Sequence, residues 1–148
     1  MQGPMDLKSL GIAWLALAAT LGGCTTTAAA PASVIAAANW TSIYRDGFGA
    51  SSGPGCATAG TCHGAATQTG VVVSKFSCAN ADDCYASVVG DSRLVLPADK
   101  DNPSGSLLIR ELRQTNGKGR MPLGSSFAFQ PEDIALIEAW IASGAPKN

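Results

Sequence analysis

The sequence predicts an all-α domain whose helices are joined by long glycine-rich loops. Apolar residues recur at helical spacing in several segments after residue 39, whereas the two runs that favour β-structure, 71–73 and 94–96, are too short to support a sheet. The chain has 148 residues, 17 of them glycine, and a formal charge of −1. This length favours one domain, and the near-neutral charge argues against a nucleic-acid partner.

A short helix is expected first. Trp40, Ile43, Tyr44 and Phe48 follow one another at positions i, i+3, i+4 and i+8, which places them on one face of a helix. A loop rich in glycine and serine follows, and it leads into a cluster of cysteines.

Two helices are expected in the middle of the chain. Asn80 is suited to cap the first of them, which carries Asp83 at its third position and ends at Gly90. Asn102 and Pro103 pair a capping residue with a proline in the first turn of the second helix. The apolar stripe of that second helix is formed by Leu107, Leu108 and Leu112.

The last helix has the clearest boundary signals. Pro131, Glu132 and Asp133 put a proline and two acids in the first turn, where the helix dipole favours negative charge. Gly144 supplies the stop signal. The expected buried face consists of Ile134, Ile137, Trp140 and Ile141.

The N-terminal segment is typical of an export signal. Lys8 precedes an uncharged apolar stretch, 10–21, which has the length of a signal-peptide core. The stretch ends in Leu-Gly-Gly-Cys, which resembles the bacterial lipobox, in which the thiol of the cysteine, here Cys24, carries the lipid. We therefore expect an exported lipoprotein on the periplasmic side of a bacterial membrane or at the cell surface. An ordinary secretory signal with an incidental cysteine is the alternative.

This interpretation divides the chain into three parts: a signal peptide (1–23), a lipidated flexible tether (24–33) and a folded domain (34–148). The tether is small, polar and without periodicity. A lipid on Cys24 would hold the domain at a membrane surface without a transmembrane helix.

Four further cysteines lie in the expected domain: Cys56, Cys62, Cys78 and Cys84. In an exported chain, an even number of cysteines is typical of disulfides, and four cysteines allow three pairings. The two local pairs are the easiest to form. We expect a disulfide between Cys78 and Cys84, because no histidine follows either residue and the residues between them indicate a capped turn.

Cys56 and Cys62 differ from that pair because His63 follows directly. Two cysteines and a histidine in the pattern C-x2-C-H attach c-type haem, but here five residues separate the cysteines. Residues 57–61 are small and can loop outward. His63 is the single histidine of the chain, and Met121, in a glycine-rich loop stiffened by proline, is the single methionine beyond the expected signal peptide. Histidine followed by methionine and a closing helix is the layout that Met/His haem ligation requires.

With these residues in place, the stretch from Cys56 to Ala145 resembles a small single-haem cytochrome c domain of the kind found in bacterial exported lipoproteins. The resemblance rests on Cys-His-Gly at 62–64, Asn-Pro-Ser-Gly-Ser-Leu-Leu at 102–108, Arg-Met-Pro at 120–122 and the segment 133–145 that ends in Trp-Ile-Ala-Ser-Gly-Ala. The five-residue gap between the cysteines departs from the family's pattern.

The resemblance implies a class I cytochrome c-like helical domain whose first and last helices cross over the edge of one haem c. The haem would be attached through Cys56 and Cys62, with His63 and Met121 as the axial ligands of the iron. Two filled axial positions leave no site for substrate, so we expect a membrane-tethered carrier of single electrons between redox partner proteins rather than an enzyme.

Two alternatives remain open at this point. A haem-free domain of the same fold, with a Cys56–Cys62 disulfide, would act as a structural or interaction module. A haem protein in which Met121 does not bind would leave a gas-binding or peroxidase-like site. A zinc site is not expected, because the chain has no C-x2-C pair and too few histidines, and no phosphate-binding loop pattern is present.

Overall fold

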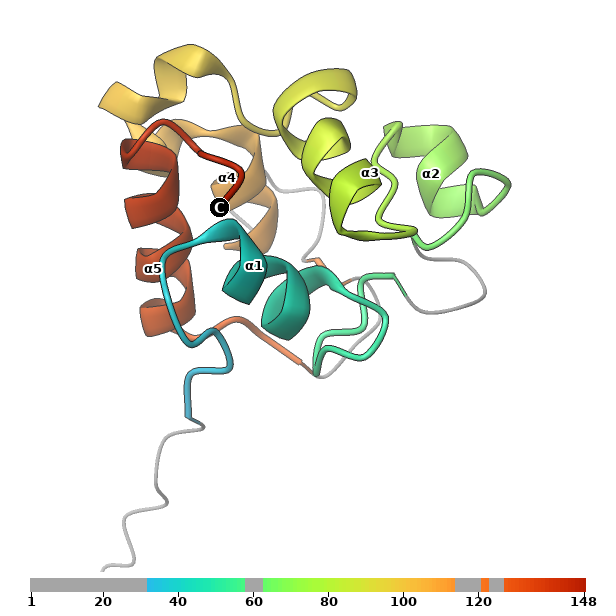
Figure 1. The fold of residues 1–148 in the computed structure, drawn as a ribbon, viewed down its shortest axis with the longest axis horizontal. Coiled ribbons are helices and arrows are strands. Elements are labelled where there is room, and N and C mark those ends of the chain that lie inside the picture. Colours follow the sequence, from blue (N-terminus) through green and yellow to red (C-terminus); the bar gives the residue numbers. More distant parts are fainter. Residues whose placement is uncertain (1–31, 58–62, 114–120, 123–126) are drawn as a thin grey trace, which may run out of the picture.

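The computed structural model describes residues 32–57, 63–113, 121–122 and 127–148. Within these ranges the chain forms helices and no strand, which confirms the all-α class for the part described. Figure 1 shows α4 and α5 together at one side of the molecule and α2 and α3 at the other, with α1 between them in this view. Cys24, Cys62 and the expected signal peptide lie outside the described residues.

The first helical segment is α1 (Trp40–Ser42), which continues as the π-helical turn η1 (Ile43–Phe48). The side chain of Asn39 caps it by accepting a hydrogen bond from the N–H of Ser42, at 2.8 Å. Trp40, Ile43 and Phe48 are buried as the spacing predicted, and Tyr44, the fourth residue of the expected face, is half-buried against the core.

The next helix, α2 (Thr69–Ser74), corrects the prediction for residues 71–73, because this run of valines forms a helical turn rather than an extended segment. Only Val71 is buried, while Val72 and Val73 are 54% and 79% exposed. β-Propensity is a preference for packing against neighbouring strands, and the described residues contain no strand to pair with. A helical turn instead satisfies some of its own backbone hydrogen-bonding groups without a partner strand.

Helix α3 (Ala81–Ala86) continues as the π-helical turn η2 (Ser87–Asp91). The predicted cap is confirmed: the side chain of Asn80 accepts hydrogen bonds from the N–H groups of Asp82 and Asp83. The helical segment ends one residue beyond the predicted Gly90. The second β-prone run, 94–96, is irregular and is tied to its neighbours by backbone hydrogen bonds between Val95 and Val88 and between Leu108 and Leu94.

The middle helix differs from its prediction in its cap and in one residue of its buried face. Two short 3-10 turns, η3 (Pro97–Asp101) and η4 (Pro103–Gly105), precede α4 (Leu107–Leu112). Asn102 makes no side-chain cap, and the hydroxyl of Ser106 instead accepts from the N–H of Ile109 at 3.3 Å. Leu108 and Leu112 of the predicted stripe are buried, but Leu107 is 37% exposed and Ile109 is fully buried instead.

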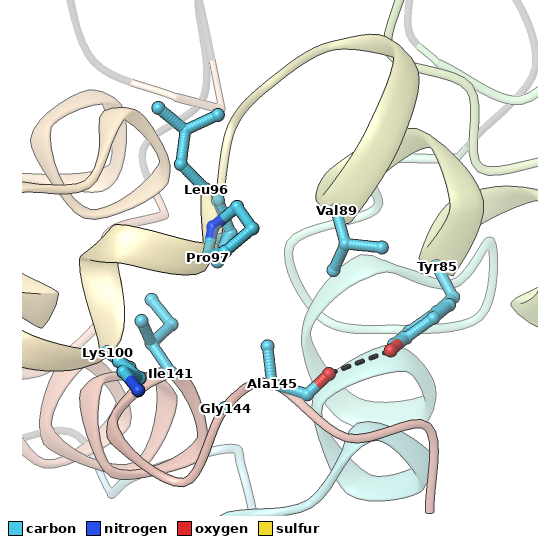
Figure 2. Close-up of a pocket in the computed structure, with 9 residues that line it drawn as sticks. Tyr85, Val89, Leu96, Pro97, Lys100, Ile141, Gly144 and Ala145 are labelled. Atoms are coloured by element: carbon cyan, nitrogen blue, oxygen red, sulfur yellow. Dashed lines mark hydrogen bonds between the residues drawn. The ribbon is translucent and has the colours of Figure 1, made fainter.

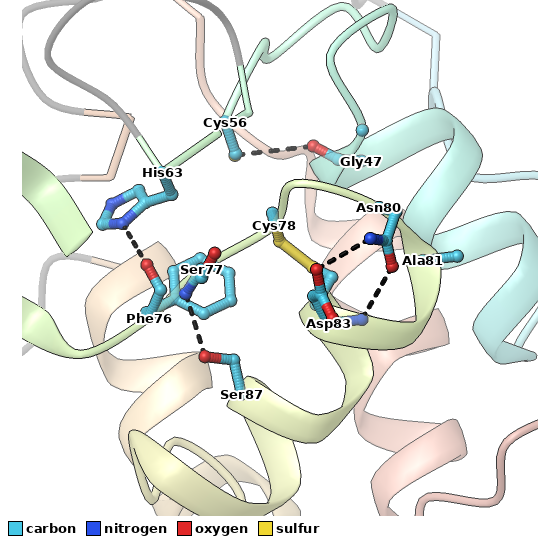
Figure 3. The surroundings of a disulfide bond; sticks show 12 residues. Gly47, Cys56, His63, Phe76, Ser77, Cys78, Asn80, Ala81, Asp83 and Ser87 are labelled. Carbon is cyan, nitrogen blue, oxygen red and sulfur yellow. Dashed lines mark hydrogen bonds between the residues drawn. A yellow bond between two sulfur atoms is a disulfide. The ribbon is translucent and has the colours of Figure 1, made fainter. Parts of the chain in front are cut away.

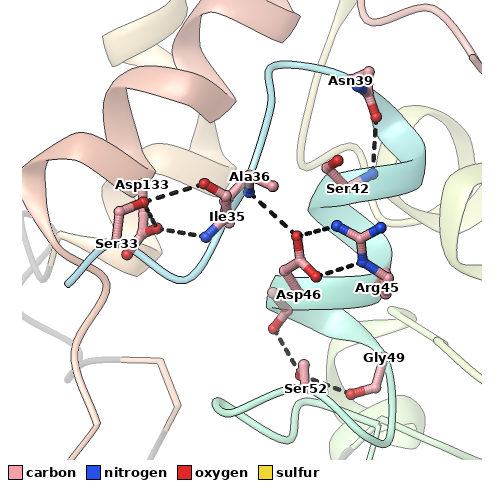
Figure 4. Close-up of polar contacts among 11 residues, drawn as sticks. Ser33, Ile35, Ala36, Asn39, Ser42, Arg45, Asp46, Gly49, Ser52 and Asp133 are labelled. Carbon is pink, nitrogen blue, oxygen red and sulfur yellow. Dashed lines mark hydrogen bonds and ion pairs between the residues drawn. The ribbon is translucent and has the colours of Figure 1, made fainter.

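Helix α5 (Pro131–Ala142) buries all four residues of its predicted face. Asp133 was expected to interact only with the helix dipole, but it is fully buried. Its Oδ1 accepts hydrogen bonds from the Ser33 hydroxyl and from the N–H groups of Val34 and Ile35, at 2.6 to 2.9 Å (Figure 4). Ser33, which the sequence analysis assigned to the tether, is thus hydrogen-bonded to α5.

Aromatic rings join the first and last helices. The ring of Trp40 lies 5.5 Å from that of Trp140 and 5.4 Å from that of Tyr85, measured between centroids. The C-terminal Asn148 accepts hydrogen bonds from the backbone of Trp40 and Thr41. No helix in the described ranges is long and apolar enough to cross a membrane.

Candidate functional site

The structure describes five of the residues predicted for the site: Cys56, His63, Cys78, Cys84 and Met121. The predicted lipidation site, Cys24, and the second predicted haem-attachment residue, Cys62, lie outside the described ranges. The first four of the five described residues gather at the segment that runs from the end of η1 to α3 (Figure 3).

The two described ends of the long cysteine loop meet. The N–H of His63 donates a hydrogen bond to the carbonyl oxygen of Cys56, at 3.0 Å. The side chain of Cys56 is 9% exposed, and its thiol points to the carbonyl oxygen of Gly47, at 3.5 Å. Cys56 and His63 are thus held side by side in the described part of the chain.

The orientation of the His63 ring is set by a backbone carbonyl. Its Nδ1 lies 2.9 Å from the carbonyl oxygen of Phe76, and Figure 3 shows the ring turned away from Cys56 and towards Phe76. A carbonyl only accepts, so Nδ1 carries the hydrogen and Nε2 carries the lone pair. Nε2 makes no hydrogen bond within the described part of the chain. It is therefore the atom that can bind a metal.

Burial lowers the pKa of His63, and the hydrogen bond to Phe76 opposes that shift. The rings of the two residues also pack against each other, with centroids 4.8 Å apart. Burial thus favours the neutral imidazole, and the hydrogen bond and the ring packing hold it in one orientation. A neutral imidazole in a fixed orientation is the form that ligates metals.

Gly64, the residue after the histidine, is required by a close approach of two backbone segments. A Cβ at this position would overlap the carbonyl oxygen of Ala57. The N–H groups of Gly64 and Ala65 both donate to the side-chain oxygen of Gln68, just before α2. The glycine therefore allows the chain after His63 to fold back against the segment that holds Cys56.

Cys78 and Cys84 form a disulfide, and both side chains are fully buried. The N–H of Cys78 donates to the carbonyl oxygen of His63, at 2.6 Å. The disulfide thus joins α3 to Cys78, whose backbone is hydrogen-bonded to the backbone of His63.

Phe76 and Ser87 are functional candidates that sequence reasoning missed. Phe76 acts through a backbone carbonyl, which every residue possesses, and Ser87 is one of many serines, so neither leaves a pattern in the sequence. Only the packing of residues 75–78 against η2 identifies them.

Met121 lies on a different part of the fold from these residues. Its N–H donates to the carbonyl oxygen of Glu111 on α4, at 3.3 Å, and its half-buried side chain packs against the hydrophobic core. The peptide bond to Pro122 is cis. The segments on either side, 114–120 and 123–126, lie outside the described residues.

Two hollows lie elsewhere on the described surface. One of about 130 Å³ is formed by η3, the end of α5 and the α3–η2 segment, with Lys100 at its edge (Figure 2). The other, about 480 Å³ and more open, lies between α2 and α3 and is lined partly by Val71 and Ser87. The first is smaller than the pockets that hold typical organic ligands, and it does not include His63.

Among the described residues, no group of three or more His, Cys, Asp and Glu side chains could hold a metal ion. Haem iron does not need such a group, since the macrocycle supplies the equatorial ligands and the protein supplies the axial ones. With Nδ1 bonded to the Phe76 carbonyl, His63 leaves Nε2 as the atom that could hold such an iron.

Comparisons with protein-family models, with curated proteins and with solved structures found no match.

Proposed function

We propose that this protein is a monohaem c-type cytochrome that carries single electrons between protein partners. In this proposal it has a class I cytochrome c-like fold and is held by a lipid on Cys24 at the periplasmic side of a bacterial membrane or at the cell surface.

The observation that supports the proposal most strongly is the Nδ1–Phe76 hydrogen bond of His63, at 2.9 Å. Metal-ligating histidines commonly donate their second ring N–H to a carbonyl or carboxylate, which selects the tautomer and raises the basicity of the ligating nitrogen. The chain has a single histidine, and it has this arrangement directly after the second cysteine of the motif.

The closed loop between Cys56 and His63 supports covalent attachment. The unusual five-residue gap is the main departure from the expected haem motif, and the backbone hydrogen bond at 3.0 Å brings the two described ends of that gap together. Gly64 allows the same close approach on its other side. In the proposal, Cys56 and Cys62 form the thioether bonds to the haem.

Haem c would supply a reversible one-electron couple at iron. His63 would bind the iron through Nε2, and Met121, as a thioether, would favour the reduced state relative to a second nitrogen ligand. The buried aromatic rings around Trp40 and Phe48 would limit access of water. Because both axial positions would be filled, the protein would transfer electrons without binding a substrate.

The test is the intact mass of the full chain, produced with a c-type maturation system and then denatured and acid-extracted. We expect a mass that is raised by one haem and survives extraction. A Cys56→Ser, Cys62→Ser double variant should show the polypeptide mass without haem. A Cys78→Ser, Cys84→Ser double variant should keep the haem if it folds. A bare polypeptide mass for the unsubstituted chain would overturn the proposal.

The same loop closure also favours one alternative, a haem-free structural or interaction module with a Cys56–Cys62 disulfide. The backbone hydrogen bond between Cys56 and His63 holds Cys56 close to the residue that follows Cys62, which would suit such a local disulfide. A polypeptide mass lowered by four hydrogens, which corresponds to two disulfides, would select this alternative.

The axial role of Met121 has its own test. In the haem-loaded protein, Met121→Ala should lower the reduction potential and open the iron to added ligands such as imidazole. An unchanged potential and absorption spectrum would remove Met121 from the site.

A further inference from the structure

The carbonyl that orients His63 belongs to a segment without regular secondary structure. Residues 75–78 lie between α2 and α3, so helical hydrogen bonds do not hold the Phe76 peptide group. A hydrogen bond can orient the ring only if its acceptor stays in place, so other contacts must fix this segment.

The side chain of Ser87, on η2, holds this segment through hydrogen bonds on both sides of Phe76. Its Oγ accepts a hydrogen bond from the N–H of Ser77 at 2.9 Å. The same hydroxyl donates to the carbonyl oxygen of Lys75 at 3.0 Å. Ser87 is only 3% exposed, so water does not easily replace either contact.

The N–H of Ser77 belongs to the same peptide group as the Phe76 carbonyl, so its hydrogen bond to Ser87 bears directly on where that carbonyl points. The preceding peptide group is held by Ser87 at the Lys75 carbonyl and by the hydroxyl of Ser74, which accepts from the N–H of Phe76 at 3.1 Å. Figure 3 shows the sequence of contacts from Ser87 through residues 76 and 77 to the His63 ring. The hydrogen bond from Cys78 reaches the backbone of His63 rather than its ring, so it does not set the ring's orientation.

We infer that Ser87 is a positioning residue for His63: through the Phe76 carbonyl it holds the imidazole as the Nδ1–H tautomer with Nε2 ready to ligate. The consequence for iron rests on the proposed function, but the effect on the ring does not. Since Ser87 is 24 residues away from His63 in the chain, local spacing gives no sign of this role.

The test uses Ser87→Ala with Ser106→Ala as a matched control. Ser106 is also a buried serine, 1% exposed, and its hydroxyl also accepts from a backbone N–H, but it caps α4 and touches neither Phe76 nor His63. Both variants should lose similar stability, so a difference between them reports on positioning alone. Circular dichroism verifies that each variant is folded.

The first readout is the tautomer of His63, measured by nitrogen NMR on isotope-labelled full chain without haem, at a pH where the ring is neutral. The single histidine makes the assignment unambiguous. The unsubstituted chain and Ser106→Ala should show mainly Nδ1–H. Ser87→Ala should lower the ratio of Nδ1–H to Nε2–H by about tenfold, the factor expected for loss of one effective hydrogen bond. Ser87→Thr, which keeps the hydroxyl, should restore it.

An unchanged ratio in Ser87→Ala, an equal change in Ser106→Ala, or an unsubstituted chain that is mainly Nε2–H would each overturn the inference. In protein that has taken up haem, Ser87→Ala should also raise the reduction potential, because a weaker hydrogen bond to Nδ1 makes the ligating nitrogen less basic. If the unsubstituted chain takes up no haem, the proposed function fails, while the tautomer measurement still decides the role of Ser87.

Discussion

The half of the molecule around α5 and the half around the cysteine loop are stabilised in different ways. Helix α5 buries Ile134, Ile137, Trp140 and Ile141 along one regular face. In the described residues from Cys56 to Cys78, α2 is the only helix, and single hydrogen bonds and one disulfide hold this segment in place.

This difference explains where a site can be built. Packing of apolar side chains tolerates small changes, but it does not fix the direction in which a particular atom points. Hydrogen bonds to a buried ring orient it, as the Phe76 carbonyl does for His63. The residues that hydrogen bonds orient therefore lie in the half around the cysteine loop, which we call the irregular half. The half around α5, the regular half, supplies most of the burial.

Among changes to polar residues, the largest effect should come from Asp133, which joins the two ends of the described chain. Asp133→Ala removes the acceptor of four hydrogen bonds, three from residues 33–35 and one from the N–H of Gln130. We expect the free energy of unfolding to fall by about 3–4 kcal/mol, since each buried unsatisfied donor costs about 1–3 kcal/mol. Urea denaturation measures it. Glu132→Ala, in the same turn and exposed, should change stability by less than about 0.5 kcal/mol. Equal losses in the two variants would contradict this role for Asp133.

A smaller loss is expected at Gly64, where the irregular half is packed most tightly. Gly64→Ala should destabilise the protein by about 1–3 kcal/mol, because the new Cβ overlaps the Ala57 carbonyl. The matched control is Gly90→Ala in η2, whose Cβ meets no atom within 4 Å. The control should leave stability unchanged or raise it slightly. Denaturation midpoints of both variants test the prediction, and a loss confined to Gly90→Ala would show that the approach is not close.

His63 should make stability depend on pH in the chain without haem. Burial lowers its pKa in the folded state below its unfolded value of about 6.5. The unfolded chain then binds more protons in this range, so the stabilisation is complete above about pH 7 and is lost as the pH falls through the folded pKa. Denaturation midpoints between about pH 8 and pH 5 should show this decrease, and His63→Gln should remove it. The pKa of Asp46 is also lowered, by Arg45, but that carboxyl titrates at lower pH.

The smallest effect is expected at Val73, and its sign distinguishes helix from strand. The side chain is 79% exposed on α2, so Val73→Ala removes little packing. Alanine has the higher helix propensity, and stability should stay the same or rise by up to about 0.7 kcal/mol. In an extended segment the same change would be unfavourable. Thermal denaturation of this variant beside Ile137→Ala, which should lose about 2–5 kcal/mol, sharpens the contrast between the two halves.

The regular half could be predicted well from the sequence. The faces of α1–η1 and α5 follow directly from the spacing of apolar residues, and the Asn80 cap follows from the placement of an asparagine before a helical stretch. These features depend on neighbours within about one or two helical turns, which a sequence shows directly.

Other features depended on residues far apart in the chain. The helical state of residues 71–73 depends on the absence of a pairing strand in the described part, and the start of α4 after Ser106 depends on how the preceding turns pack. The burial of Asp133 depends on residues about 100 positions earlier.

For the site, the sequence by itself determined which atoms are available: two cysteines, a single histidine and a methionine in an order suited to haem. Only the tertiary structure decided which nitrogen of His63 is free to ligate, because that depends on the carbonyl of Phe76 and on the hydroxyl of Ser87 that holds it. The physical reason is that a backbone carbonyl carries no sequence signal, whereas its position in space determines the tautomer of the ring beside it.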